Sequence, residues 1–289
     1  MLTTRAKVAL ANALSSALAI ASVKMDRRCR RHGVTFELDL REGIDLSLFV
    51  LGEFQSHVLK LIRQFVPRDG IVVDVGANVG AISLPAAVWL DQGHVYAIEP
   101  TDFAFAKLQR NLSCNPEIAK RITAVRTFIA DESKAESDLT AFSSWPLGAA
   151  APDSLHSVHR GMKMSTTCGQ ITMDEFLSER NVRASLIKID TDGNEFAILK
   201  GAHAALESMR PVVIFEACEY LMTPPRPTYE DFETLFERYA YIICDPKSLK
   251  AIDAISFRRC CPRGAGLDLM AVPDERLRAM RALGRSRSA

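Results

Sequence analysis

Residues 74–80, DVGANVG, form the first group whose types and spacing could do chemistry. The pattern is D-x-G-x-N-x-G, built from Asp74, Gly76, Asn78 and Gly80. Gly76 lets the backbone turn sharply and approach a ligand because it has no Cβ, and Asn78 tolerates left-handed geometry. The dinucleotide loop G-x-G-x-x-G, which seats a pyrophosphate on a helix N-terminus, has other glycine spacings. The segment therefore predicts a tight turn for a ligand without phosphate, with a purely structural turn as the alternative.

A carboxylate follows the next predicted strand. Glu99 lies 23 residues after Gly76, near the offset at which an acid reaches a ribose diol, and a carboxylate can accept from both hydroxyls. Its alternative role is an N-cap or first-turn acid of the helix that begins near Asp102. Asp131, after the third predicted strand, is placed to accept from an adenine amino group. These residues indicate an adenosine-type ligand, and the loop spacing favours S-adenosylmethionine over NAD.

Further acids follow the fourth and fifth predicted strands, in KIDTDGNE and IFEACEY. Asp190, Glu195 and Glu216 are candidates for positioning a nucleophile, for general base catalysis or for holding a divalent cation. Ordinary turn chemistry and a solvated strand end are the alternatives. His156 and His159 form an H-x-x-H pair without further ligands at matching spacing, so no metal site is predicted. His159 is a weaker candidate base.

The elements that must position these residues alternate from about residue 70. Apolar, β-branched runs predict strands at 71–75, 94–99, 122–129, 185–190, 211–216, 241–244 and 267–272, and helical spacing predicts helices at 81–90, 102–114, 173–180, 195–208 and 229–239. Residues 131–170 read as irregular. Strands alternating with helices imply a mostly parallel α/β sheet with helices on both faces, which binds ligands beyond the carboxyl ends of its strands.

Composition limits the possible function classes. The 289 residues include 36 Lys and Arg against 35 Asp and Glu, a formal charge of +1 that argues against a nucleic-acid binder. The seven cysteines form no C-x-x-C pair, which favours a reduced, cytoplasmic setting. No apolar run is long enough for a transmembrane segment. We expect an Ala-rich helix and a basic linker in 1–35, the main domain in 36–273 and an Arg-rich tail in 274–289.

The quoted segments together resemble the FkbM family of S-adenosylmethionine-dependent methyltransferases. The resemblance rests on IVVDVGANVGAIS, VYAIEP, SLIKIDTDGNEFAILKGA and PVVIFEACE, with LDLREGIDLSLFVLGEFQ upstream. The D-x-x-G-x-E block followed by LKGA is its most specific part. Asp192 stands where the family often has Glu.

The resemblance implies a class I methyltransferase (Rossmann-like) fold with a seven-stranded sheet. It implies O-methylation of a hydroxyl on a small molecule, sugar or glycolipid. By that similarity the glycine loop cradles the methionine part of the cofactor, Glu99 holds the ribose and Asp131 the adenine, while Asp190 and Glu195 match the acidic block. The acceptor and the oligomeric state stay open.

Three other functions compete with this one. An NAD-dependent oxidoreductase could use a similar sheet, but the glycine spacing disfavours it. A nucleic-acid or amine methyltransferase is the second alternative, but amine methylation often uses N/D-P-P-Y/F after the fourth strand, where this chain has DTDG. A degenerate methyltransferase fold that only binds ligands would not need an intact loop, ribose acid and acidic block.

Overall fold

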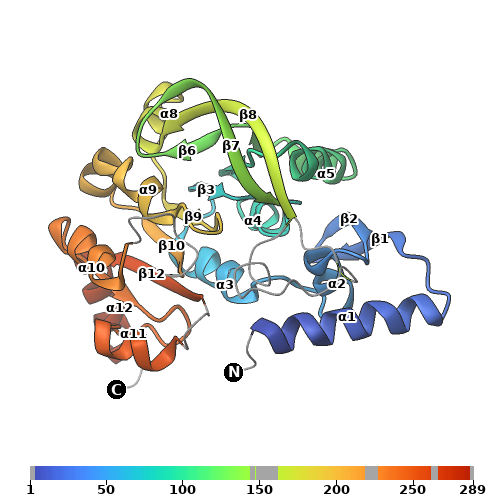
Figure 1. The fold of residues 1–289 in the computed structure, drawn as a ribbon. Coiled ribbons are helices and arrows are strands. Elements are labelled where there is room, and N and C mark those ends of the chain that lie inside the picture. Colours follow the sequence, from blue (N-terminus) through green and yellow to red (C-terminus); the bar gives the residue numbers. More distant parts are fainter. Residues whose placement is uncertain (1–3, 144–146, 148–161, 219–226, 262–265, 287–289) are drawn as a thin grey trace.

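The computed structural model describes residues 4–143, 147, 162–218, 227–261 and 266–286. Its centre is a seven-stranded sheet (Figure 1). In spatial order the strands are β11 (Tyr241–Cys244), β12 (Leu267–Pro273), β10 (Val212–Ala217), β9 (Leu186–Ile189), β3 (Ile71–Val75), β4 (His94–Ile98) and β5 (Ile122–Val125). Neighbours pair in parallel except β12, which is antiparallel to β10 and β11. The predicted seven-stranded, mostly parallel sheet is confirmed.

The direction in which strands are added reverses at β3. Strands β4 and β5 extend the sheet on one side of β3, and β9 and β10 extend it on the other. Sheets of this kind bind ligands beyond the carboxyl ends of the strands at such a reversal. Along β3, Val72 packs into the core on one face and Val73 into the core on the other. Because side chains alternate along a strand, Asp74 points to the same face as Val72.

Helices cover both faces, as predicted, and each face buries its own apolar core. The core on the Val72 face includes residues of α2 (Gly43–Val50), α3 (Ser56–Phe65), α4 (Ser83–Trp89), α5 (Asp102–Ser113), α6 (Pro116–Ala119) and α12 (Asp274–Ser286). The opposite core includes residues of α8 (Met173–Glu179), α9 (Glu195–Lys200), α10 (Tyr229–Arg238), α11 (Ala254–Cys260) and a π-helical turn at Ala205–Met209. The single helix predicted at 195–208 is wrong, because α9 ends at the C-cap Gly201.

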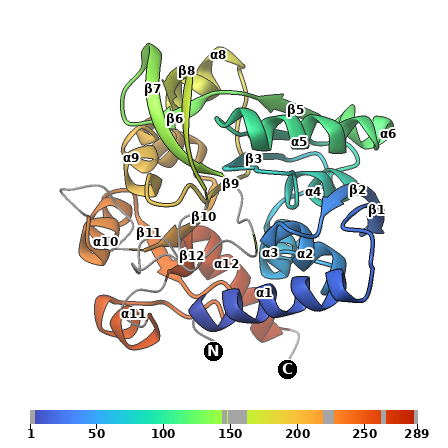
Figure 2. The ribbon, with the colours of Figure 1, turned by 45° about the vertical axis from the view of Figure 1, so that its right-hand side comes forward.

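The N-terminal segment packs beside α2 (Figure 2). Helix α1 (Thr4–Ile20) forms where an Ala-rich helix is predicted, and the Ser15 hydroxyl donates to the Leu40 carbonyl at 3.0 Å. The basic linker predicted after it is wrong. Residues 26–39 form an antiparallel hairpin of β1 (Asp26–Arg31) and β2 (Val34–Asp39). The run of arginines in β1 hides its strand signal, while β2 alternates buried and partly buried residues.

The segment predicted to be irregular contains a long hairpin instead. Strands β7 (Lys134–Ser143) and β8 (Met162–Thr172) pair in antiparallel, and β6 (Phe128–Ala130) joins β8 in a second, three-stranded sheet. The third predicted strand, 122–129, is therefore two strands in different sheets. The helix predicted at 173–180 forms as α8, and Thr172 caps it, since its side chain accepts from the Glu175 amide.

The C-terminal segment is largely helical. Within the predicted Arg-rich tail, Asp274–Ser286 form α12, whose Leu277 is buried. No helix in the described part of the chain is long and apolar enough to cross a membrane.

Candidate active site

The loop after β3 turns back against two neighbouring strands. The amides of Gly76 and Ala77 both donate to the Ile98 carbonyl, at 3.0 and 2.9 Å, and the Gly80 amide donates to Ala77. Gly76 has a φ of +77°, and a Cβ there would lie 1.9 Å from the Asp190 carbonyl oxygen. Only glycine tolerates both conditions. The predicted tight turn is therefore wedged between the ends of β4 and β9.

Glu99 lies directly beside this loop. Its Oε2 accepts from the Asn78 amide at 3.0 Å, and its Oε1 accepts from the Thr101 amide and hydroxyl. Asn78 itself has the left-handed φ of 49° that the sequence led us to expect. Burial raises the pKa of Glu99, and the hydrogen bonds from Thr101 and Asn78 oppose that rise. The glycine loop and Glu99, the acid predicted to bind the ribose, are therefore in contact.

The Asp74 carboxylate contacts two side chains of the same chain, Ser83 and Lys188. It is fully buried, its Oδ2 accepts from the Ser83 hydroxyl at 2.6 Å, and its Oδ1 lies 3.1 Å from the Lys188 ammonium. Burial alone would lower the pKa of Lys188, but the charges of Asp74 and Asp190 raise it. The ion pair joins β3 to β9 directly beneath the glycine loop, where the two residues are register partners.

Glu195 is also held by its own loop. Its Oε1 accepts from the Thr191 amide at 2.8 Å and from the Thr191 hydroxyl at 3.0 Å, and its Oε2 accepts from the Gly193 amide at 3.0 Å. The residue is 1% exposed. Burial raises its pKa, and these hydrogen bonds oppose the rise. The Glu195 carboxylate therefore shapes the turn after β9.

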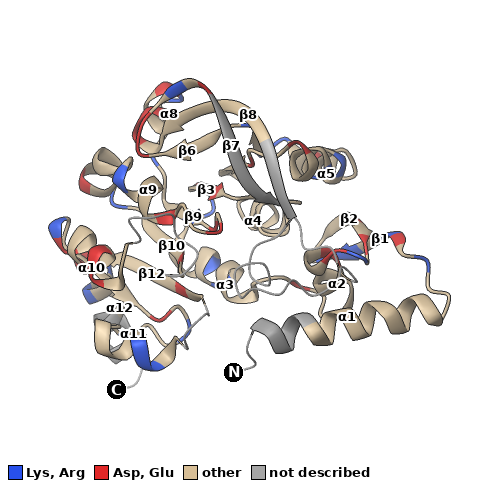
Figure 3. Ribbon diagram, in the orientation of Figure 1, with Lys and Arg blue, Asp and Glu red and all other residues tan. Residues whose placement is uncertain are grey.

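Asp190 and Glu216 belong to a row of acids at the carboxyl ends of β9 and β10. The Asp190 carboxylate accepts from the Gln55 side chain at 3.0 Å and lies 3.5 Å from the Lys188 ammonium. Burial, followed by the charges of Asp190 and Asp268, raises the pKa of Glu216 well above its ordinary value. Figure 3 shows red, acidic segments near β9 and on β12.

Three residues around Glu216 were not predicted. Asp268 is its register partner on β12, and His57 of α3 lies with Nε2 3.0 Å from the Asp268 carboxylate. A Cβ on Gly266 would lie 1.9 Å from Glu216 Oε1, so the backbone there presses against the carboxyl group. Gln55 was missed in the same way. These residues come from segments far apart in sequence, and no local pattern marks them.

Asp131 lies outside this row. It follows β6 in the smaller sheet and forms an ion pair with Lys200. The hydrogen bond from Lys200 lowers the pKa of Asp131. His156 and His159 lie outside the described residues. Among the side chains that the structure does describe, no group of three or more His, Cys, Asp or Glu is arranged to hold a metal ion.

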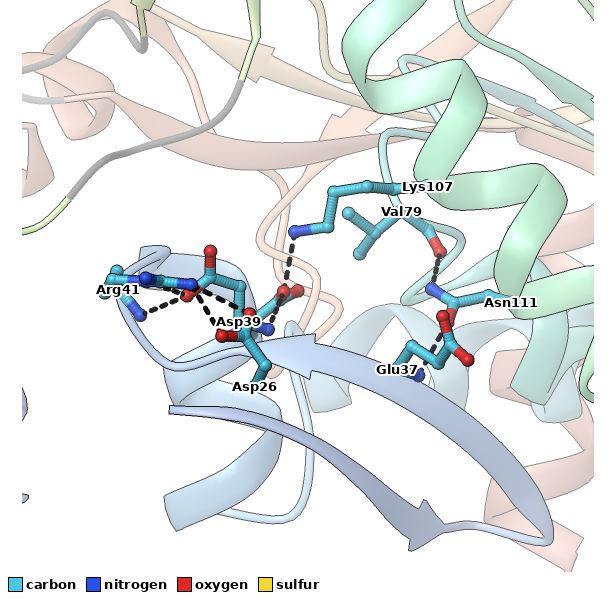
Figure 4. A network of polar contacts seen from close by, with 8 residues as sticks. Asp26, Glu37, Asp39, Arg41, Val79, Lys107 and Asn111 are labelled. Carbon is cyan, nitrogen blue, oxygen red and sulfur yellow. Dashed lines mark hydrogen bonds and ion pairs between the residues drawn. The ribbon is translucent and has the colours of Figure 1, made fainter. Parts of the chain in front are cut away.

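The N-terminal hairpin is bonded to the glycine loop through α5 (Figure 4). Asn111 donates to the Val79 carbonyl and accepts from the Glu37 amide, each at 2.8 Å. Nearby, the Lys107 ammonium lies 2.6 Å from the buried Asp45 carboxylate, which also accepts from the Asp39 amide. The hairpin therefore supports the loop that carries the site.

The family model described as the methyltransferase FkbM domain matches residues 74–243, more than half of the chain. The chain belongs to the FkbM methyltransferase family. The predicted family, the enzyme class and the cofactor S-adenosylmethionine are thereby confirmed. The matched region includes the glycine loop, Glu99, Asp190 and Glu216.

Two curated relatives are similar to this FkbM methyltransferase. The hexuronic acid methyltransferase AglP of Haloferax volcanii is 26% identical over 161 residues, 55% of this chain and 61% of that protein. A probable histone-arginine methyltransferase CARM1 of Oryza sativa subsp. indica is 29% identical over 217 residues, 69% of this chain and 40% of that protein. The chain thus spans less than two thirds of either relative.

Solved structures give weaker similarities. The crystal structure of methyltransferase FkbM from Methylobacillus flagellatus KT has a TM-score of 0.43 and 17% identity, covering 71% of this chain and 44% of that one. A putative transferase from Pyrococcus horikoshii has a TM-score of 0.46 and 16% identity, covering 91% and 83%. At these values the similarities add nothing to the family match.

The residues around the loop fit the FkbM cofactor by their chemistry. A carboxylate has about four acceptor positions, and Glu99 uses three of them on protein donors. One position is left for a ribose hydroxyl. Gln55 Oε1 is a buried acceptor without a hydrogen-bond partner among the described residues. The bound cofactor supplies an electrophilic methyl group on a sulfonium centre.

Proposed function

We propose that this protein transfers the methyl group of S-adenosylmethionine to a hydroxyl of a sugar, glycolipid or other small molecule. The observation that carries the proposal is the position of Glu216 at the carboxyl end of β10, opposite Asp268 of β12 and beyond the same strand ends as the glycine loop and Asp190. A hydroxyl is a weak nucleophile, so a carboxylate at this position can assist by accepting its proton. Burial and the charges of Asp190 and Asp268 raise the pKa of Glu216 above its ordinary value, the direction that strengthens a base. Glu216 is therefore the base that takes the acceptor's proton.

The other predicted residues have supporting roles in this proposal. The glycine loop from Asp74 to Gly80 receives the methionine part of the cofactor, Glu99 the ribose and Asp131 the adenine. Asp190 lies between loop and base, in contact with Gln55 and Lys188. Glu195 is a positioning residue, because its carboxylate holds the turn after Asp190. No step in this scheme requires a metal ion.

A sugar acceptor has support from one relative, since AglP is described as a hexuronic acid methyltransferase. The formal charge of +1 disfavours nucleic acid as the acceptor. The seven cysteines form no C-x-x-C pair, which is poor spacing for a disulfide framework and is typical of proteins in reducing compartments. We therefore place the reaction in the cytoplasm.

A labelled methyl-transfer assay tests the proposal. Purified protein is incubated with methyl-labelled S-adenosylmethionine and a panel of hydroxylated glycans, glycolipids and small natural products. Label stable to mild base on an acceptor hydroxyl is expected, because an ether resists conditions that hydrolyse methyl esters. Transfer only to carboxyl groups or to protein arginine would contradict it.

A further inference from the structure

Gln55, the residue before α3, has an unusual backbone conformation. Its φ of 45° and ψ of 51° are left-handed, although it is neither glycine nor asparagine. Such geometry is costly for a residue with a Cβ and is concentrated at functional sites. The side chain does not cap α3, the common role at this position. Its amide nitrogen instead donates to Asp190 Oδ2 at 3.0 Å.

The contact with Asp190 fixes which way the amide of Gln55 faces. A carboxylate only accepts hydrogen bonds, so the nitrogen must face it and the oxygen must face away. That oxygen, Oε1, is buried and has no hydrogen-bond partner among the described residues. An unpaired buried acceptor costs free energy. Gln55 Oε1 is therefore able to accept from a donor that the described residues do not supply.

The position of Asp190 indicates which ligand group comes near. Its amide donates to the Val75 carbonyl at 3.1 Å, and its own carbonyl occupies the space that a side chain on Gly76 would fill. The Asp190 side chain is 27% exposed. Lys188 lies closer to Asp74 than to Asp190, at 3.1 against 3.5 Å. The Asp190 carboxylate thus adjoins the loop and retains capacity to accept.

We propose that Gln55 and Asp190 together bind the α-ammonium group of the methionine part of S-adenosylmethionine. An ammonium group has three donors, so it can donate one to Gln55 Oε1 and one to the Asp190 carboxylate. The positive charge of the ammonium group is attracted to the Asp190 carboxylate, and one of its N–H groups gives Gln55 Oε1 the hydrogen bond that it lacks. The inference rests on the proposed placement of the methionine part at the glycine loop.

Isothermal titration calorimetry with two product-like ligands tests the inference, because it measures binding affinity without any turnover. S-adenosylhomocysteine carries the amino-acid end, and 5′-methylthioadenosine lacks it. Gln55→Met keeps the length of the side chain but removes both amide groups. We expect it to weaken S-adenosylhomocysteine binding tenfold or more, while 5′-methylthioadenosine binding changes by less than twofold.

Two further variants keep the test decisive. Gln55→Gly removes the side chain and suits the left-handed backbone, so it serves if Gln55→Met fails to fold, and the same selective loss is expected. Glu99→Gln should weaken both ligands by the same factor, because both carry the ribose. Equal loss of both ligands in the Gln55 variants, or no loss, overturns the inference. If the unmodified protein binds neither ligand, the proposed cofactor site itself is wrong.

Discussion

The main-chain nitrogen of Asn78 lies 3.0 Å from Oε2 of Glu99. This hydrogen bond joins the loop after β3 to the end of β4. The loop and the carboxylate must therefore move as one body, since a shift of either leaves a buried donor or acceptor unpaired. A ligand that spans them meets a site that is already formed.

Replacing Glu99 with Ala is expected to weaken cofactor binding at least tenfold. The change removes the proposed ribose acceptor and leaves the Asn78 and Thr101 donors unpaired, a loss of about 1–3 kcal/mol. Calorimetry with S-adenosylhomocysteine measures the effect. Unchanged affinity would refute the ribose assignment, and Thr123→Ala, which alters an exposed contact with His94, serves as the control.

Replacing Glu216 with Gln is expected to lower the methyl-transfer rate by about 10²–10⁴-fold, the usual contribution of a general base. Cofactor affinity should stay within twofold. In the unmodified enzyme the rate should rise with pH as Glu216 loses its proton, with a midpoint above the ordinary glutamate range. Glu237→Gln, on the exposed side of α10, is the matched control. A variant that keeps full rate would remove Glu216 from the mechanism.

The raised pKa of Glu216 also predicts how stability depends on pH. Folding favours the protonated form of Glu216. Its contribution to the free energy of unfolding is therefore complete below the pKa of the unfolded state, and it is lost as pH rises through the higher pKa of the folded state. Glu216→Gln cannot ionise and avoids that loss. The melting temperature of the variant minus that of the wild type should therefore increase between pH about 5 and about 8. A difference that is flat or falls with pH would show that Glu216 is ionised in the folded protein at ordinary values.

Replacing Gly266 with Ala is expected to lower methyl transfer while leaving cofactor affinity unchanged. The new Cβ would lie 1.9 Å from Glu216 Oε1, so the carboxyl group must move. Gly169→Ala is the matched control, because a Cβ there meets only the Ala135 carbonyl, at an ordinary 3.6 Å. Steady-state kinetics of both variants should show the fall in kcat for Gly266→Ala alone, and similar kcat values would argue against the proposed position of the base.

The sheet was predictable because its strands are buried on both faces and are therefore apolar almost throughout, as in IVVDV. The β7–β8 hairpin was missed because its flanking Ser, Pro and Gly residues resemble a loop. The arginines of β1 hid the N-terminal hairpin, although the alternation in VTFELD was a usable signal for β2.

The contacts of the candidate site also divide into those that spacing in the sequence can predict and those that it cannot. The contact between Asn78 and Glu99 follows from adjacent parallel strands, so spacing could anticipate it. Gln55 contacts Asp190, and Gly266 contacts Glu216, only through tertiary packing. No spacing in the sequence predicts these contacts. Sequence could propose Glu195 as a base, but only the structure shows its carboxylate turned into its own loop.

Strand β12 lies between β10 and β11 although it follows both in the chain. The stretch that matches the family model ends at residue 243 and so omits this strand. Excised alone, that stretch would carry β10 and β11 with an empty slot between them and with unsatisfied edges facing the gap. The matched stretch is therefore not expected to fold as an independent domain. In it, Glu216 would lack its neighbours Asp268 and Gly266.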